Sequence, residues 1–246
     1  MAGMKQCVVM AALAMGIAAG CGEPSGVRGK AVGRWMAVPE GVVRGDDGRE
    51  WTAGGFELAR TETTVGEWVQ YLNASGADWG GSPQVDRKRG RWRAVPRAER
   101  AAAGWISAED AEGFCRWASG VEGRTVRLPR EEEWEAGARG GTDGAFYPWG
   151  WDDPAPGRCQ GGYEGCAGAL AAAGSLPGNG YGLRETSGNL WEWCEAAGGG
   201  GRRRIRGGAW PERGKEAVRC GSGRDAAGTE RWGDTGFRAL REGSQE

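Results

Sequence analysis

The chain of 246 residues carries 32 basic and 33 acidic side chains, 49 glycines, 14 tryptophans and no histidine. A formal net charge of −1 gives no sign of a nucleic-acid-binding surface, so we expect no nucleic-acid partner. Without histidine the chain lacks the usual general base and the commonest transition-metal ligand, which excludes Ser-His-Asp triads and imidazole iron sites.

The first twenty residues have the organisation of a secretory signal. Lys5 supplies a positive charge, and residues 7–19 form an apolar run of about thirteen residues, the length of a signal-peptide core and too short to span a bilayer. The run ends in Ala18-Ala19-Gly20-Cys21, which resembles the lipobox of bacterial lipoproteins and predicts acylation of Cys21. Plain secretion after ordinary cleavage is the alternative.

These features divide the chain into a lipoprotein signal peptide (residues 1–20), a tether (residues 21–33) and one domain (residues 34–246). The tether is small, polar and contains proline, as a flexible linker does. Gly22 rather than aspartate follows the cysteine, so the resemblance to Gram-negative lipoproteins implies the outer membrane or cell surface. A secreted or periplasmic protein is the alternative location.

Two capping boxes predict the first two helices. Thr64 and Glu67 have the spacing of a box that begins a helix ending near Ser75. Ser107 and Asp110 form a second box. The helix after it has apolar residues at i, i+3, i+4 and i+7, a single buried stripe made of Ala111, Phe114, Cys115 and Ala118.

The rest of the chain predicts short elements in a loop-rich domain. A third helix follows Pro129, with Trp134 and Ala138 facing inward, and stops at Gly140. Apolar runs at residues 204–210 and 235–240 are bounded by turn residues and predict short strands.

A central segment, residues 181–194, is predicted to be a loop. Gly182 and Gly188 permit turns, and irregular backbone beside buried tryptophans must find partners for its carbonyl groups. Two further segments are rich in basic residues. Residues 202–206 are interpreted as a solvated loop, and residues 87–93 as an exposed insert at which a partner could bind.

Seven short blocks follow one another along the chain. They are Trp105-Ile-Ser-Ala-Glu-Asp, Val126-Arg-Leu-Pro, Tyr147-Pro-Trp-Gly, Asn179-Gly-Tyr-Gly-Leu, Gly188-Asn-Leu-Trp-Glu-Trp, Arg206-Gly-Gly-Ala-Trp and Gly236-Phe-Arg. In this order they resemble the formylglycine-generating enzyme (sulfatase-modifying factor) family. The resemblance implies an α+β domain, a variant of the C-type lectin-like fold with short helices and strands and much irregular structure. That family is divided between oxidases that convert a substrate cysteine to formylglycine and relatives with other roles.

The resemblance does not extend to the copper site of the oxidases. In the family, two copper-binding cysteines lie shortly after a Gly-Gly-Ser block, and thiolates suit Cu(I) because both are soft. Here residues 211–219 contain no cysteine, and Ala209 stands where a serine lines the oxygen pocket, although Trp191 matches the pocket tryptophan. We therefore expect no copper site and a pseudoenzyme rather than an enzyme.

The resemblance does imply a structural calcium site in the central loop. Its ligands would be the side chains of Glu185 and Glu192 and the backbone carbonyls of Gly188 and Leu190, which are the hard oxygen donors that Ca²⁺ prefers. The alternative is that Glu192 hydrogen-bonds amides of its own loop and Glu185 is solvated.

Five of the seven cysteines remain once the leader and the lipidated residue are set aside. The resemblance pairs Cys115 with Cys220, and proximity favours Cys159 with Cys166, which leaves Cys194 free or competing for Cys220. A Cys115–Cys220 bridge would close a loop of about 105 residues and stabilise the fold by about 4 to 5 kcal/mol on the chain-entropy model.

Two functions follow. The favoured one is a non-catalytic, lipid-tethered binding or scaffold domain that presents its loops to an envelope protein or glycan. The alternative is a metal-dependent oxidase acting on cysteine residues of sulfatase-type substrates. A receptor diversified in its C-terminal loops is disfavoured, because residues 211–246 contain no Asn or Tyr, the residue types that such mutagenesis leaves.

Overall fold

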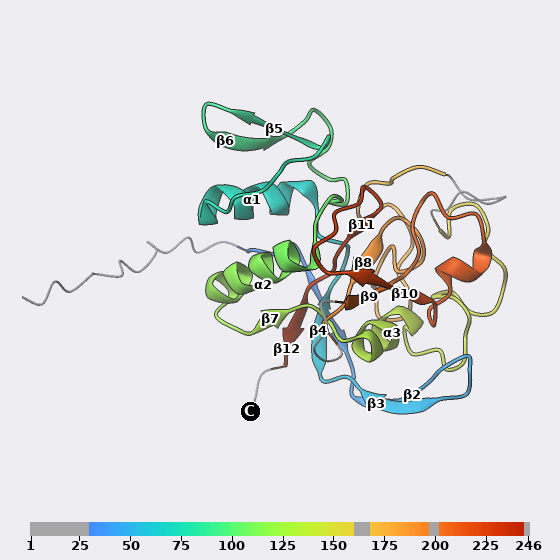
Figure 1. Cartoon of the computed structure of the whole chain (residues 1–246). Coiled ribbons are helices and arrows are strands. Elements are labelled where there is room, and N and C mark those ends of the chain that lie inside the picture. Colours follow the sequence, from blue (N-terminus) through green and yellow to red (C-terminus); the bar gives the residue numbers. More distant parts are fainter. Residues whose placement is uncertain (1–29, 160–167, 197–201, 244–246) are drawn as a thin grey trace, which may run out of the picture.

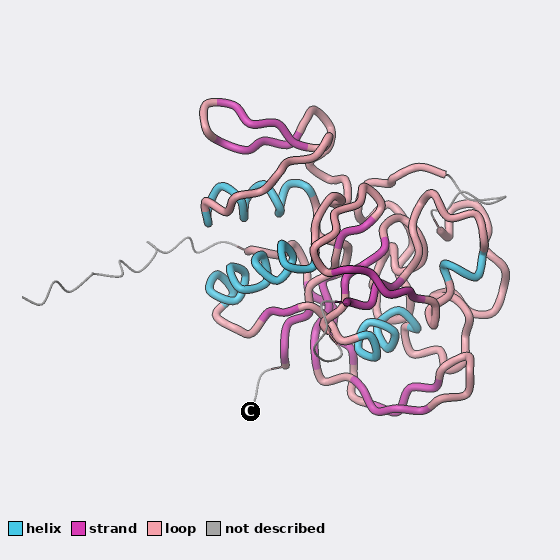
Figure 2. Tube along the Cα trace, in the orientation of Figure 1, coloured by secondary structure: helices cyan, strands magenta, loops and turns pink. Residues whose placement is uncertain are grey.

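The computed structural model describes residues 30–159, 168–196 and 202–243. In this part of the chain, three α-helices and many short strands are joined by long irregular connections (Figures 1 and 2). The mixture of elements confirms the predicted α+β class. The predicted signal peptide, including Cys21, and most of the tether lie outside the described residues.

The three predicted helices are confirmed: α1 (Val65–Ser75), α2 (Ala108–Glu122) and α3 (Glu131–Arg139). Both capping boxes form, since the side chains of Thr64 and Ser107 each accept a hydrogen bond from the backbone N–H three residues on. Each helix is followed by a left-handed glycine, for example Gly76 with a φ of 66°. The predicted stripe on α2 is buried along its whole length.

The first sheet brings both ends of the domain together. Its strands are β1 (Trp35–Val38), β4 (Phe56–Ala59), β12 (Leu240–Glu242) and β7 (Val126–Arg127), in the order β1-β4-β12-β7. All three pairings are antiparallel, with Leu240 of the C-terminal strand opposite both Leu58 and Arg127. The fold therefore closes only when the end of the chain has been inserted between β4 and β7.

The second sheet carries the central segment. Its order is β10-β9-β8-β11, and its strands are β10 (Gly223–Ala227), β9 (Arg202–Arg206), β8 (Trp191–Trp193) and β11 (Thr235–Gly236). The prediction of a loop over residues 181–194 is therefore wrong for the last part, where the tryptophans form an inner strand. That strand is buried and pairs on both edges with distant segments, which local turn residues do not indicate.

The two predicted strands have different limits in the structure. The strand expected at residues 204–210 begins at Arg202 and ends at Arg206, because Gly207 and Gly208 adopt φ values of 96° and 72°. The run at residues 235–240 is divided between β11 and β12, which belong to different sheets.

Two hairpins lie outside these sheets: β2 (Gly41–Arg44) with β3 (Glu50–Ala53), and β5 (Val85–Lys88) with β6 (Arg91–Ala94). The β5–β6 hairpin projects past α1 at the top of Figure 1. A short 3-10 helix, η1 (Lys215–Val218), follows β9. Among the described residues, no helix combines the length and apolar character needed to cross a membrane.

Aromatic side chains from α1, α2 and the C-terminal segment form the main core. Trp68 of α1 lies 6.2 Å from Phe114 of α2 and 6.3 Å from Phe237, measured between ring centroids. Phe114 and Phe237 are themselves 5.2 Å apart in an edge-on arrangement. Such pairs add to the free energy gained from burial alone, so this cluster fixes both helices against the sheets.

The predicted bridge between Cys115 and Cys220 is wrong. Both residues are free thiols, and Cys115 belongs to the α1–α2 core whereas Cys220 lies in a separate buried cluster with Trp134 and Cys194. The stripe of α2 directs Cys115 into the core, away from the other cysteines. Cys194 is free as well. Cys159 is disulfide-bonded, and its predicted partner Cys166 lies outside the described residues.

Candidate functional site

The central loop is held in place by buried polar contacts with distant residues. Asn189 adopts a φ of 70°, its side-chain N–H donates to Glu62 (2.6 Å), and its side-chain oxygen accepts from the backbone N–H of Ala171 (2.8 Å). The backbone N–H of Leu190 donates to the other oxygen of Glu62 (3.0 Å). Glu62 thus takes up donors that an irregular loop would otherwise leave unpaired.

Glu192 lies in the centre of the domain and is paired with Arg238. One carboxylate oxygen accepts from the Arg238 guanidinium at 2.8 Å, and the other accepts from Arg238 Nε at 3.0 Å and from Trp134 Nε1 at 2.6 Å. Both charged side chains have an exposed fraction of 0%. Arg238 also donates to the backbone carbonyls of Ala59 and Arg184, so its positive charge is fully coordinated by protein groups.

The remaining acidic groups nearby are forced toward the neutral form. Burial, followed by the charges of Glu192 and Glu185, raises the pKa of Glu62 well above its usual range. Burial also raises the pKa of Glu185, although two backbone N–H groups oppose this by donating to it, from Gly174 and Leu176 at 2.8 Å each. Glu185 is 4% exposed, so the alternative that it is solvated is wrong.

The four predicted calcium ligands, Glu185, Gly188, Leu190 and Glu192, share one segment, but both carboxylates already have protein donors. A calcium ion at Glu192 would share that carboxylate with Arg238, whose positive charge repels the cation. The arrangement therefore fits Ca²⁺ poorly. Calcium binding stays a prediction, and melting curves recorded with calcium and with a chelator are its test.

A cleft of about 630 Å³ opens beside the segment where the family's cysteines would lie. Its walls are aromatic with a few polar groups, and the residues that matter here are Gln84, Trp105, Trp210, Arg224, Trp232 and Asp234. Pro211, the first residue of the cysteine-free segment, also lines it. A concave apolar surface with a few placed polar groups is the usual form of a binding site.

The tryptophans of this cleft are positioned by the backbone. Trp105 adopts a φ of 62°, remains 40% exposed and donates its backbone N–H to the carbonyl of Trp232 at 2.8 Å. A Cβ at Gly233 would lie 3.0 Å from the Trp105 ring, so glycine permits this close approach. Trp232 in turn stacks on the buried Trp193 of β8, with ring centroids 6.2 Å apart.

Arg224 forms the charged side of the cleft. It is an exposed residue of β10, and its guanidinium lies over two rings, 5.2 Å from the centroid of Trp191 and 5.5 Å from that of Trp232. Trp191 donates its indole N–H to Glu212 at 2.9 Å. A carboxylate from the cysteine-free segment therefore occupies the polar edge of the tryptophan that matches the family's pocket residue.

The sulfur atoms of the described free cysteines do not suit a copper centre. Cys115, Cys194 and Cys220 are all fully buried, and burial raises the pKa of the Cys220 thiol to about 12 and raises those of the other two as well. A metal binds the thiolate form, which burial disfavours. Ala209 is completely buried, and its methyl side chain has no hydroxyl to contribute.

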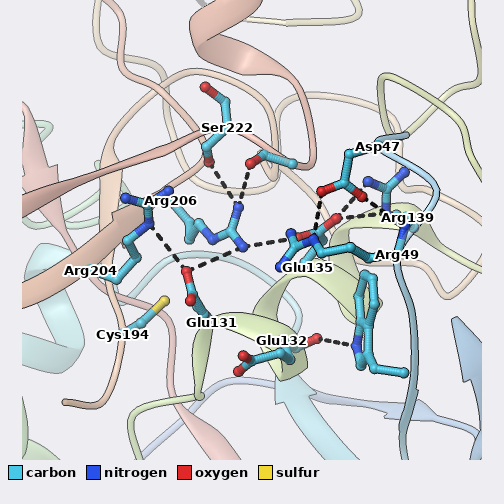
Figure 3. A network of polar contacts seen from close by, with 12 residues as sticks. Asp47, Arg49, Glu131, Glu132, Glu135, Arg139, Cys194, Arg204, Arg206 and Ser222 are labelled. Carbon is cyan, nitrogen blue, oxygen red and sulfur yellow. Dashed lines mark hydrogen bonds and ion pairs between the residues drawn. The ribbon is translucent and has the colours of Figure 1, made fainter. Parts of the chain in front are cut away.

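A second cluster of buried charges joins helix α3 to strand β9 of the second sheet (Figure 3). Glu135 of α3 pairs with Arg139 at 2.5 Å and with Arg206 of β9 at 2.9 Å. Arg206 also reaches Glu131 at 3.4 Å, and its exposed fraction is 2%. The interpretation of residues 202–206 as a solvated loop is therefore wrong, because these residues form strand β9 and Arg206 is buried against Glu135, 71 residues earlier.

Sequence reasoning located the central loop but missed most of the cleft. Trp105 and Arg238 lie within blocks that resemble the family, so the sequence marked both residues. The blocks did not indicate which residues their side chains contact in the fold. Glu62 and Arg224 lie outside all blocks, and only the folded chain brings them to Asn189 and to the two tryptophans.

Comparison with known proteins identifies relatives of this chain. The chain is 36% identical to Inactive C-alpha-formylglycine-generating enzyme 2 of Mus musculus over 120 residues, covering 43% of this chain and 36% of that protein. It is 41% identical to Formylglycine-generating enzyme of Thermomonospora curvata over 104 residues, covering 36% and 31%. The chain thus spans about a third of the length of the curated relatives it matches.

The fold is similar to that of PvdO from Pseudomonas aeruginosa, with a TM-score of 0.69 and 24% identity over 87% of this chain and 96% of that one. At this identity the likeness shows the fold alone. The model of the family described as "Sulfatase-modifying factor enzyme 1-like domain" matches residues 36–243. Since that match covers most of the chain, the protein belongs to the sulfatase-modifying factor (FGE-sulfatase) family.

Proposed function

We propose that the chain is a non-catalytic binding domain of its family, and that the tryptophan-lined cleft holds its partner. The observation that carries this proposal is the cleft itself: it lies beside Pro211, at the start of the segment that lacks both family cysteines, and is lined by Trp105, Trp210 and Trp232. The name of the mouse relative, an inactive generating enzyme, supports a role without catalysis.

The lining indicates the kind of partner. Flat indole rings bury apolar surface and stack on peptide side chains or sugar rings, while Arg224, Asp234 and Gln84 can exchange hydrogen bonds at the rim. The partner that fits is an exposed segment of an envelope protein or glycan. The part of the partner that enters the cleft has to be flat or extended, because the indole of Trp105, which is 40% exposed, forms one wall of the cleft.

The binding role is tested by comparing cleft and surface variants. Trp105→Asn removes one wall with a residue that tolerates the left-handed backbone, and Arg224→Gln removes the charged side. Trp151→Asn is the matched control, because Trp151 is 58% exposed and does not line the cleft. Immobilised chains are incubated with an envelope fraction, and the retained molecules are identified.

A partner retained by the wild type and by the Trp151 variant, but lost from both cleft variants, is the expected result. Equal retention by all four chains would show that the cleft is not the binding surface.

The proposal includes anchoring through Cys21, which the lipobox supports. Tethering would depend on acyl chains, so Cys21→Ser is expected to move the protein from the membrane fraction to the soluble fraction. Fractionation followed by immunodetection measures this. Recovery of the variant wholly in membranes would contradict the anchor without affecting the cleft.

The alternative function, oxidation of a peptidyl cysteine, is favoured only by the likeness to generating enzymes. Activating dioxygen there requires a redox metal, and Cu(I) needs soft ligands close together. Residues 211–219 provide none, and the three described free thiols are buried. Incubating the chain with copper, a reductant and a cysteine-bearing sulfatase-type peptide is expected to give no aldehyde by mass spectrometry. Turnover above a metal-only control would establish the enzyme instead.

A further inference from the structure

The β5–β6 hairpin and the residues just after it carry a high density of positive charge. Residues 85–97 contain six basic side chains and one acidic side chain, Asp86, in a chain whose net charge is −1. All six are exposed, and no carboxylate of the described residues forms an ion pair with any of them. The six are Arg87, Lys88, Arg89, Arg91, Arg93 and Arg97.

Contacts with α1 and with Trp79 fix the backbone of the hairpin. The side chain of Asn73 on α1 donates to the backbone carbonyl of Trp92 (2.9 Å) and accepts from its backbone N–H (3.0 Å). Trp92 also packs edge-on against Trp79, with ring centroids 5.7 Å apart. Arg89 and Gly90 adopt φ values of 52° and 78°, as the two central residues of a tight hairpin turn do. The backbone that carries the cations is therefore positioned before any ligand arrives, which lowers the entropic cost of binding.

Three of the six cations, Lys88, Arg91 and Arg93, share the outward face of the hairpin with Asp86. Arg87 lies on the other face, across from Trp92, with its guanidinium 5.3 Å from the Trp92 ring centroid. Val85 pairs with Ala94, and their side chains share the face of Trp92, which packs toward α1 and is half-buried or buried. The opposite face carries Lys88 directly across from Arg91, and Arg93 across from Asp86. Like charges directly opposite each other destabilise a strand pair. The hairpin thus keeps an unfavourable arrangement that an anionic ligand would relieve.

The hairpin and the last residue of the predicted tether contact the same helix. The backbone N–H of Gly33 donates to Glu67 of α1 at 2.7 Å. Asn73, which holds the hairpin, is six residues further along this helix, about 9 Å along its axis.

We propose that the outward face of the β5–β6 hairpin binds the surface of a bilayer that contains anionic phospholipid. Lys88, Arg91 and Arg93, with Arg89 at the turn, make four cations, and a cluster of four or more Lys and Arg side chains is the arrangement that anionic headgroups attract. The hairpin protrudes from the domain beyond α1 (Figure 1), so its outward face can meet an extended charged surface. This inference rests on the hairpin charges and does not depend on the cleft.

The test uses the full chain carrying Cys21→Ser, so that no acyl group contributes, and sedimentation with vesicles. Vesicles of phosphatidylglycerol and phosphatidylcholine are compared with phosphatidylcholine alone at low salt. In the same background, Lys88→Gln with Arg91→Gln removes two outward cations, and Arg202→Ser with Arg213→Ser removes two exposed cations elsewhere.

Binding to the anionic vesicles is expected, weakening as salt is raised. Each cation near such a surface is worth about a fivefold change in partition, so the hairpin double variant is expected to bind about 30-fold more weakly. The control double variant is expected to bind like its parent. Unchanged melting curves show that both variants are folded.

Equal binding to both kinds of vesicle, or equal losses in the two double variants, would overturn the proposal. So would retention on a heparin column with no vesicle binding, because that result would assign the hairpin to a soluble polyanion instead.

Discussion

Two groups of arginines in this domain have opposite surroundings. Arg139, Arg206 and Arg238 are among the most deeply buried side chains in the described residues, and each has a carboxylate partner within 3.0 Å. The arginines of the β5–β6 hairpin are exposed, and no carboxylate of the described residues pairs with them. The comparison shows that one residue type serves as an internal support in one region and leaves free charge in another.

Desolvation explains the difference. Moving a charge out of water costs several kcal/mol, so an arginine is buried only where partners surround it. Arg238 meets this condition through Glu192 and two backbone carbonyls. An exposed arginine incurs no such cost and gains little from an ion pair. Its charge is then available to a ligand.

Removing a buried partner is the strongest way to test this comparison. Arg238→Met is expected to destabilise the domain by about 3 to 5 kcal/mol, because Glu192 is left as a buried charge without its counter-ion. Urea denaturation followed by tryptophan fluorescence measures the free energy of unfolding. The variant Arg238→Met with Glu192→Gln should recover part of the loss. A loss of unfolding free energy below about 1 kcal/mol, the range of exposed ion pairs, would show that the Arg238–Glu192 pair does not stabilise the central loop.

The cluster around Glu135 should respond less strongly, since its members have additional partners. Arg139 keeps Asp46 (2.8 Å) and Arg206 keeps Glu131 (3.4 Å) when Glu135 is neutralised. Glu135→Gln is therefore expected to cost about 2 kcal/mol, the value of a hydrogen bond to a charged group. A double-mutant cycle with Arg206→Met should give a coupling of about 0.5 to 3 kcal/mol. Strict additivity would mean that the two residues do not interact.

The pair of Asp110 and Arg231 is an intermediate case. Asp110 is partly buried and accepts from Arg231 at 2.6 Å and 2.9 Å, while Arg231 is 42% exposed. Burial raises the pKa of Asp110, but hydrogen bonds from Arg231 and Ser107 outweigh this, so the pKa lies below its usual value. Asp110→Asn is expected to cost about 1 kcal/mol at neutral pH, the upper range for exposed pairs.

The sign of the pH dependence follows from the lowered pKa. Asp110 contributes stability above its unfolded pKa of about 3.9, and that contribution is lost as the pH falls through the lower folded value. The difference between wild type and Asp110→Asn should therefore shrink below about pH 4. Thermal melting at several pH values tests this, and a constant difference would show that the ionisation of Asp110 does not contribute to the loss.

The hairpin cations should show the smallest effect on stability. Arg89→Asn is expected to change the free energy of unfolding by less than about 0.5 kcal/mol, since it removes an exposed charge and places a residue suited to the left-handed turn. Unchanged stability beside a large loss for Arg238→Met would sharpen the comparison. A loss above about 2 kcal/mol would show that the hairpin charges are structural.

The three helices and the family were predictable from the sequence because their signals are local. The residues of each capping box lie three positions apart, and the terminating glycines lie next to the last turn, so neighbouring residues decide where α1 and α2 begin and end. The family blocks are likewise short segments read directly from the chain, and the match over residues 36–243 confirms them.

Only the tertiary structure decided which distant residues meet. Trp191–Trp193 form a strand because β9 and β11 flank them, and Cys115 stays free because α2 directs it into another core from Cys220. Arg206 is buried because Glu135, 71 residues earlier, neutralises it. Pairing, burial of charge and disulfide choice depend on contacts between segments far apart in the chain, and no local pattern of residue types encodes those distances.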